Sequence, residues 1–110
     1  MFTTPSKLLT VVLPDSAEGQ LQVELRALGV VGYTATTSRG HGVHGDRPSR
    51  FYGDNCRIEI LATQDVIDQV LELLERRYLP VNPLVAWVSD VEAFPGEKIA
   101  VSRRSIPSTP

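Results

Sequence analysis

Four segments of the chain carry the hydrophobic pattern of β-strands. Short apolar runs rich in β-branched residues, or alternating apolar and polar positions, are typical of strands. The four segments are Lys7–Leu13, Tyr33–Ser38, Cys56–Ala62 and Leu84–Val91. In Cys56–Ala62 the apolar residues recur at every second position, so one face of that strand is expected to be buried. Pro14 is expected to end the first strand, because proline cannot donate a backbone hydrogen bond.

Two segments between these strands have the three- and four-residue spacing of amphipathic helices. The first helix is predicted to begin at Asp15 and Glu18, which are spaced as a capping box, and to end at Gly29, which can form a left-handed cap. The second is predicted to begin after Thr63 and to end before Pro80. Their apolar positions are Leu21, Leu25 and Leu28 in the first helix and Val66, Ile67, Val70, Leu71 and Leu74 in the second.

This element order predicts a ferredoxin-like α+β fold, βαββαβ, in which both helices cover one face of an antiparallel four-stranded sheet. The strands at 7–13 and 84–91 carry apolar residues on both of their faces. The sheet face without helices is therefore expected to be buried against other subunits. A cyclic trimer meets this need, and on this evidence a dimer meets it as well.

Composition narrows the class of protein. The 110 residues are enough for one domain, with 42% hydrophobic and 22% charged residues and a formal net charge of −2. That charge leaves no global electrostatic footprint for nucleic acid. The single cysteine, Cys56, allows no internal disulfide and no cysteine-rich metal site, and its apolar neighbours predict a buried thiol. No stretch reaches the length of a membrane span, so we expect a cytoplasmic protein without membrane insertion.

The most distinctive chemistry lies in Arg39–Asn55, a segment between the second and third strands that lacks apolar periodicity and contains four glycines. Glycines allow positive φ angles, so successive backbone N–H groups can converge on a phosphate or similar anion, and basic side chains add donors. The residues of these two kinds are Gly40, Gly42, Gly45, Arg39, His41 and His44. The glycines lead into no helix, which excludes a Rossmann or P-loop site. The alternative interpretation is a mobile hairpin loop with solvent-exposed histidines.

The run Gly29–Gly42 (GVVGYTATTSRGHG) resembles the helix end, second strand and T-loop entrance of PII signal proteins. Ile58–Ile60 and Val88–Val91 are similar to the third and fourth strands of that family, and the resemblance covers about residues 7–94. It implies a homotrimer with adenine-nucleotide sites in the clefts between subunits. Each site would lie beneath the base of a T-loop that changes shape with the ligand, and a partner protein would bind one of these shapes.

Departures from the PII pattern reduce the number of ligands that the resemblance implies. Typical PII proteins continue the T-loop with Gln-Lys-Gly and carry a B-loop rich in glycine and lysine, whereas His44, Gly45 and Leu79–Pro83 occupy those places here. The usual triphosphate clamp is thus largely missing. Val88–Glu92 and the following Lys98 are more similar to the PII-like branch associated with bicarbonate uptake and carboxysomes. That branch implies AMP, ADP or cyclic AMP, with bicarbonate in some members, no cofactor, and a partner such as a bicarbonate transporter or a carboxysome-associated protein.

The resemblance also implies where the ligands bind. Residues from Ser38 to Gly45 would wrap the phosphates, and Arg39 and Gly40 would hold bicarbonate. Ala62 matches a family position whose backbone contacts the edge of the adenine base. Lys98 matches a basic family position whose side chain reaches a phosphate from the neighbouring chain. The implied nucleotide-binding residues are therefore Ser38, Arg39, Gly40, His41, Gly42, Val43, His44, Gly45, Ala62 and Lys98. The domain is expected at 1–96, with its T-loop at 39–55 and an arm and flexible tail at 97–110.

Several other functions stay open at this point. One alternative is a nitrogen-regulatory sensor of ATP and ADP. Another is a trimeric metal-binding or metal-tolerance protein. The spacing of His41, His44 and Asp46 would allow a metal site, but loop ligands without fixed outer partners argue against it, so we expect no metal site there. An RNA-binding sheet would need more strand aromatics than Tyr33 and Trp87. A small ferredoxin-like enzyme such as a monooxygenase is a further alternative, but no nucleophile–base pair or carboxylate pair stands out, so we expect no enzymatic activity.

Overall fold

The computed structural model describes residues 3–30, 32–39 and 54–95. The four strands and two α-helices follow one another in the order that the sequence pattern predicts, and two short helical turns, which it did not predict, lie between them. The elements are β1 (Thr4–Pro14), the 3₁₀ turn η1 (Asp15–Ala17), α1 (Glu18–Ala27), β2 (Thr34–Arg39), β3 (Asp54–Ala62), α2 (Gln64–Leu73), the π-helical turn η2 (Leu74–Tyr78) and β4 (Val85–Ala93). Within these ranges, neither α-helix is long and apolar enough to cross a bilayer.

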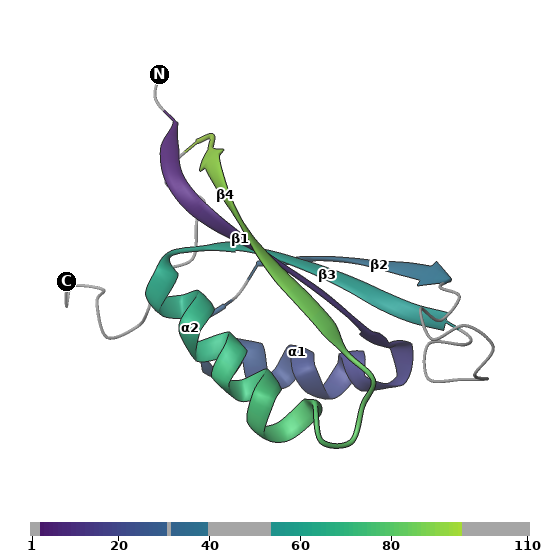
Figure 1. The fold of residues 1–110 in the computed structure, drawn as a ribbon. Coiled ribbons are helices and arrows are strands. Elements are labelled where there is room, and N and C mark those ends of the chain that lie inside the picture. The colour runs from purple at the N-terminus through teal and green to yellow at the C-terminus, as the bar shows by residue number, and fades with distance from the viewer. Residues whose placement is uncertain (1–2, 31, 40–53, 96–110) are drawn as a thin grey trace.

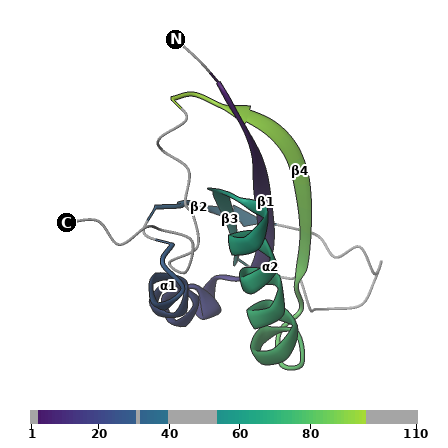
Figure 2. The same cartoon turned by 90° about the vertical axis from the view of Figure 1, so that its left-hand side faces the viewer.

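The four strands form one antiparallel sheet in the order β2-β3-β1-β4. Both helices lie on the same side of this sheet, as Figure 1 and the rotated view in Figure 2 show. This arrangement confirms the predicted ferredoxin-like α+β fold. The start of β1 and the end of β4 pair with each other beyond the end of β3 and project as a two-stranded ribbon (Figure 1).

The core lies between the sheet and the helices. In β3 the side chains of Cys56, Ile58, Ile60 and Ala62 are all at most 2% exposed, which confirms the predicted alternation. They pair in register with Leu13, Val11, Leu9 and Lys7 of β1. From the helices, Leu21, Leu25, Val66, Ile67, Val70 and Leu74 complete this layer. Burying each such aliphatic side chain contributes about 1.5–3 kcal/mol, so this cluster dominates the stability of the fold.

The first helix begins differently from the expectation. Pro14 keeps an extended backbone, η1 follows it, and α1 starts only at Glu18, with Ala17 at its N-cap and no side-chain cap. The capping box predicted at Asp15 and Glu18 is therefore wrong, because the turn after Pro14 is 3₁₀ and not α-helical. The helix end is as predicted: Gly29 has φ of 97°, and its N–H donates to the Arg26 carbonyl at 2.9 Å.

The second helix begins after Thr63, as predicted, although the Thr63 hydroxyl donates to the Asp65 carboxylate and not to the backbone. Its last turn widens into the π-helical turn η2, where the Leu79 N–H donates to the Leu74 carbonyl at 2.8 Å. The sequence pattern did not predict this turn. It carries Tyr78, which is 3% exposed, into the space between the two helices.

The sheet face opposite the helices carries apolar side chains with no helix over them. Register places Thr10 of β1 beside Trp87 of β4, and Val12 beside Val85. Trp87 is 42% exposed and Val85 is 47% exposed. We call this surface, formed by Leu8, Thr10, Val12, Arg57, Leu61, Val85 and Trp87, the open sheet face. Its apolar content agrees with the expectation that another subunit covers it, which stays a prediction.

Candidate functional site

The described residues contain only the entrance of the predicted anion loop. Ser38 and Arg39 are the last residues of β2, and their backbones pair with Asn55 and Asp54 of β3. Strand pairing therefore extends further than expected at both ends, and the connection between β2 and β3 spans 40–53 and not 39–55. The predicted contacts of Gly40, His41, Gly42, Val43, His44, Gly45 and Lys98, and the possible ligands His41, His44 and Asp46, lie outside the described residues.

Ala62, the remaining predicted residue, lies at the opposite end of the sheet. The loop entrance adjoins Asp54, the first residue of β3, whereas Ala62 is the last residue of the same strand. At about 3.3 Å per residue, these two ends are about 25 Å apart. This distance exceeds the length of a nucleotide, so the loop entrance and Ala62 of one chain cannot contact the same nucleotide molecule.

Only the backbone of Ala62 is available to a ligand, because its side chain is 0% exposed and packs in the core. One edge of β3 pairs with β1 along the whole strand. On the other edge, the ladder with β2 ends at the pair Thr34–Glu59. The stretch Ile60–Ala62 therefore has no strand neighbour on that edge within the described part of the chain. This geometry is compatible with the main-chain contact that the sequence resemblance implies.

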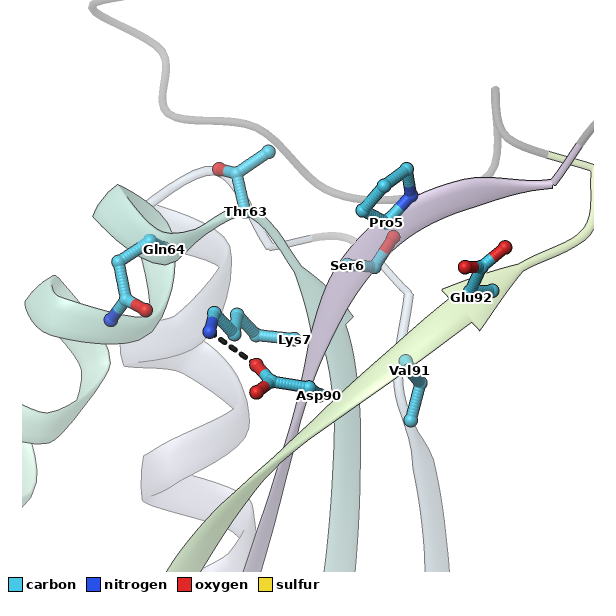
Figure 3. Close-up of a pocket in the computed structure, with 8 residues that line it drawn as sticks. All are labelled: Pro5, Ser6, Lys7, Thr63, Gln64, Asp90, Val91 and Glu92. Atoms are coloured by element: carbon cyan, nitrogen blue, oxygen red, sulfur yellow. Dashed lines mark hydrogen bonds and ion pairs between the residues drawn. The ribbon is translucent and has the colours of Figure 1, made fainter.

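An open cleft of about 590 Å³ lies beside Ala62, between the start of α2 and the β1–β4 ribbon. Figure 3 shows the side chains around it, which come from three elements and the residue between β3 and α2. They are Pro5, Ser6, Lys7, Thr63, Gln64, Asp90, Val91 and Glu92. An ion pair between the Lys7 ammonium and the Asp90 carboxylate crosses the cleft (Figure 3).

Strand register explains why these charged groups lie on the helix side of the sheet. Lys7 and Leu9 are two residues apart on β1, so Lys7 points to the same face as the core. Asp90 is the register partner of Lys7 on β4. At this end of the sheet the helices no longer cover that face completely. The side chains of Lys7 and Asp90 are therefore 32% and 83% exposed. The ion pair is consequently solvent-accessible.

The lining of the cleft is largely apolar, and several polar groups within it can form hydrogen bonds. The Thr63 hydroxyl, the Gln64 amide and the Lys7 ammonium supply donors, and Asp90 and Glu92 supply acceptors. The Gln64 amide already donates to Asp68 at 2.8 Å, and Thr3 donates to Glu92 at 2.5 Å. No sequence motif marked these residues as a common site. The available signal was a pair of opposite charges, Lys7 and Asp90, inside two otherwise apolar strands.

Comparisons with known proteins identify the family. The model of the family described as "Nitrogen regulatory protein P-II" matches residues 6–98. A PII-like signaling protein of Thermus thermophilus has a solved structure that is 35% identical, with a TM-score of 0.76, and the match covers 90% of this chain and 99% of that one. A comparison with curated protein sequences found no match.

Structures of CPII, a nitrogen regulatory PII-like protein from Thiomonas intermedia, share the fold. One of them, bound to ADP, AMP and bicarbonate, is 23% identical with a TM-score of 0.70, and the match covers 83% of this chain and 94% of that one. The apo form of CPII is 18% identical with a TM-score of 0.71, and the match covers 83% of this chain and 94% of that one. The family model covers most of the chain, and the Thermus structure aligns over nearly its whole length. The chain therefore belongs to the P-II family of nitrogen regulatory proteins.

Proposed function

We propose that this protein is a non-enzymatic regulatory sensor that binds an adenine nucleotide, AMP or ADP, in clefts between the subunits of a homotrimer. The observation that carries the proposal is the separation of the two halves of the predicted site. The loop entrance at Arg39 and the backbone edge at Ala62 lie at opposite ends of one sheet. They can contribute to one nucleotide site only if the two ends come from different subunits.

The open sheet face supports the subunit association that this site needs. Leu8, Val12 and Leu61 are partly buried, and Val85 and Trp87 are more exposed, on a face that neither of the described α-helices covers. Burial of apolar area drives subunit association, and closed cyclic symmetry is the usual result in soluble homo-oligomers. Membership of the P-II family favours three subunits over two.

The choice of ligand rests on the PII-like relatives and on the chemistry of the loop. CPII was solved with ADP, AMP and bicarbonate, and in this chain the glycine-rich sequence after Arg39 offers backbone N–H groups to anions of this kind. We propose that Ser38–Gly45 holds the nucleotide phosphate and that Arg39 and Gly40 hold bicarbonate beside it. Cyclic AMP is a further candidate, since it carries the same base and a single phosphate.

The signal would be a ligand-dependent conformation of the loop at 40–53. The strand pairs Ser38–Asn55 and Arg39–Asp54 hold the two ends of this segment together. A ligand that contacts the loop in only one of its conformations shifts the population toward that conformation. A target protein in inorganic-carbon metabolism, such as a bicarbonate transporter or a carboxysome-associated protein, would then bind that conformation.

Isothermal titration calorimetry of the purified protein tests the proposal. AMP, ADP, ATP and cyclic AMP are titrated separately, each with and without bicarbonate. We expect AMP or ADP to bind at one equivalent per chain. Arg39→Ala should weaken binding by about 10–100-fold, because an ionic hydrogen bond to phosphate contributes on the order of 1.5–3 kcal/mol. Arg76→Ala is the matched control, since Arg76 forms only an exposed ion pair with Glu72 at 3.8 Å.

Two outcomes would contradict the proposal. Absence of binding for all four nucleotides would exclude a nucleotide sensor. Binding of ATP in clear preference to AMP and ADP would support the alternative function, a nitrogen-regulatory sensor of ATP and ADP. The description of the matched family, a nitrogen regulatory protein, agrees with that alternative.

A further inference from the structure

Two carboxylates and the thiol of Cys56 lie close together at the end of the sheet where β2 enters the loop. The side chains are Asp15, Glu18 and Cys56, and their ligand atoms all lie within 4.8 Å of one another. They come from three separate elements: Asp15 opens η1, Glu18 opens α1 and Cys56 lies in β3. None of them belongs to the nucleotide site proposed above.

The fold holds these three groups in place. Cys56 is the register partner of Leu13, the residue before Pro14, so the chain leaves β1 directly beside the thiol. The 3₁₀ turn then brings Asp15 and Glu18 back over β3. The Tyr33 hydroxyl donates to the Glu18 carboxylate at 3.3 Å, which orients that carboxylate from the side of β2. Such an outer hydrogen bond is typical of ligands in metal sites.

Among the described residues, the cluster has no positively charged partner. No lysine or arginine among the described residues forms an ion pair with Asp15 or Glu18; Lys7, Arg57, Arg76 and Arg77 pair instead with Asp90, Glu59, Glu72 and Glu24. The Cys56 thiol is 2% exposed, makes no hydrogen bond within the described part of the chain and lies against both carboxylates. A bound cation would supply the positive charge that these side chains lack among the described residues.

We propose that Asp15, Glu18 and Cys56 form a binding site for one divalent cation of the zinc class. A thiolate and two carboxylates are suitable ligands for Zn²⁺ and Co²⁺, whereas Mg²⁺ and Ca²⁺ prefer oxygen ligands alone. Zn–S and Zn–O distances of about 2.3 and 2.0 Å place the ligand atoms of a tetrahedral ion about 3.5 Å apart. The three side chains need to close by about 1 Å to reach this geometry, and the fourth position would take a water molecule.

The position of the cluster gives the site a regulatory role in the proposed sensor. Cys56 pairs with Thr37, and the next two pairs along the same ladder are Ser38–Asn55 and Arg39–Asp54, where the loop at 40–53 begins. A cation would fix the β1–α1 connection to β3 at this point. It would therefore restrain the base of the loop without contacting the nucleotide.

Titration of the metal-free protein with Co²⁺ tests the proposal. A thiolate ligand gives a near-ultraviolet charge-transfer band, and a tetrahedral site gives intense visible absorption. We expect one equivalent of Co²⁺ per chain with both signals, and displacement by Zn²⁺. Absence of the thiolate band would overturn the proposal, whether or not Co²⁺ binds elsewhere.

Variants separate this site from other metal-binding positions. Tyr33→Phe should weaken binding by about 10–100-fold, the usual cost of losing an outer-shell hydrogen bond, and Asp15→Asn, which replaces a ligand, should weaken it further. Cys56→Ser should abolish the thiolate band, with circular dichroism confirming that the fold is retained. Asp68→Asn, an exposed carboxylate on α2, is the matched control and should bind as the wild type does. Equal affinity of the wild type, Asp15→Asn and Cys56→Ser would place the metal elsewhere and overturn the proposal.

Discussion

The guanidinium of Arg57 lies over the indole ring of Trp87, 5.6 Å from its centroid, on the open sheet face. Arg57 also forms an ion pair with Glu59 at 3.6 Å. This cation–π contact spans β1, because Arg57 belongs to β3 and Trp87 to β4. Thr10 of the strand between them, the register partner of Trp87, is only 1% exposed. The centre of the open sheet face is thus already ordered within one chain, which lowers the entropic cost of packing against another subunit.

We expect Trp87→Glu to convert the proposed homotrimer to a monomer, because it places a carboxylate in the middle of the apolar contact surface. Analytical ultracentrifugation measures the change. The matched control is Val23→Glu, since Val23 is 67% exposed on α1, on the opposite side of the molecule.

The same pair of variants tests the intersubunit nucleotide site. If the site needs two chains, monomeric Trp87→Glu should lose nucleotide binding while its circular dichroism stays unchanged, and Val23→Glu should bind normally. A monomeric variant that binds AMP or ADP as tightly as the wild type would place the site within one chain.

Tyr78→Phe should destabilise the fold by about 1.5–3 kcal/mol, the usual contribution of a buried hydrogen bond to a charged group. The Tyr78 hydroxyl donates to the Glu24 carboxylate, which Arg77 also contacts at 2.7 Å, so this cluster joins η2 to α1. Urea denaturation measures the free energy of unfolding. Arg76→Gln, which removes the exposed ion pair to Glu72, should cost less than about 0.5 kcal/mol. Similar losses in the two variants would argue against a structural role for the Tyr78 hydroxyl.

Alanine should have opposite effects at the two glycines Gly29 and Gly19. Gly29 has φ of 97°, which strains any residue with a Cβ, so Gly29→Ala should destabilise the protein by about 1–2 kcal/mol. Gly19 lies inside α1, and no atom lies within 4 Å of the position that an alanine methyl group would take, so Gly19→Ala should stabilise by about 0.5–1 kcal/mol. Thermal unfolding of both variants gives the sign directly. A shift of the same sign in both would contradict this account of the α1 cap.

The pKa of Cys56 predicts a loss of stability in alkaline solution. Burial and the neighbouring carboxylates raise this pKa from 9.0 to about 11 in the folded protein. The unfolded chain therefore releases the proton first, and the stability that the neutral thiol contributes is complete below pH 9 and is lost as the pH rises toward 11. The full effect is about 2–3 kcal/mol.

Urea denaturation of metal-free protein between about pH 8 and pH 10.5 measures this effect. We expect the free energy of unfolding of the wild type to fall more steeply with pH than that of Cys56→Ala. Comparison of slopes removes the constant loss of packing in the variant, and it also removes the contribution of Tyr78, whose raised pKa does not involve Cys56. Part of the raised pKa of Tyr33 comes from Cys56 itself, so that part counts toward the effect of the thiol. Parallel curves would show that the thiol is not perturbed.

Much of the fold could be predicted because its signals are local. The alternation of Cys56, Ile58, Ile60 and Ala62 identifies a strand with one buried face, and the structure confirms all four burials. Gly29 ends α1 because glycine adopts positive φ without a Cβ clash. The η1 turn and the π-helical turn at Tyr78 could not be predicted, because packing against the other elements selects them over a regular α-helix.

The groups that come together across the fold were the least predictable. Lys7 and Asp90 pair through the β1–β4 register. Asp15 and Glu18 lie close to Cys56 because the end of β1 places them beside β3. In the sequence, the same two acidic residues indicated only a helix cap.

The sequence by itself determined the element order, the buried faces, the glycine-rich loop and the resemblance to PII proteins, because periodicity and backbone preference are properties of neighbouring residues. Only the tertiary structure decided that the loop entrance and Ala62 lie at opposite ends of one sheet. The physical reason is that strand register and direction depend on pairing between distant segments, where the gain from burying a shared core outweighs the local preferences of each segment.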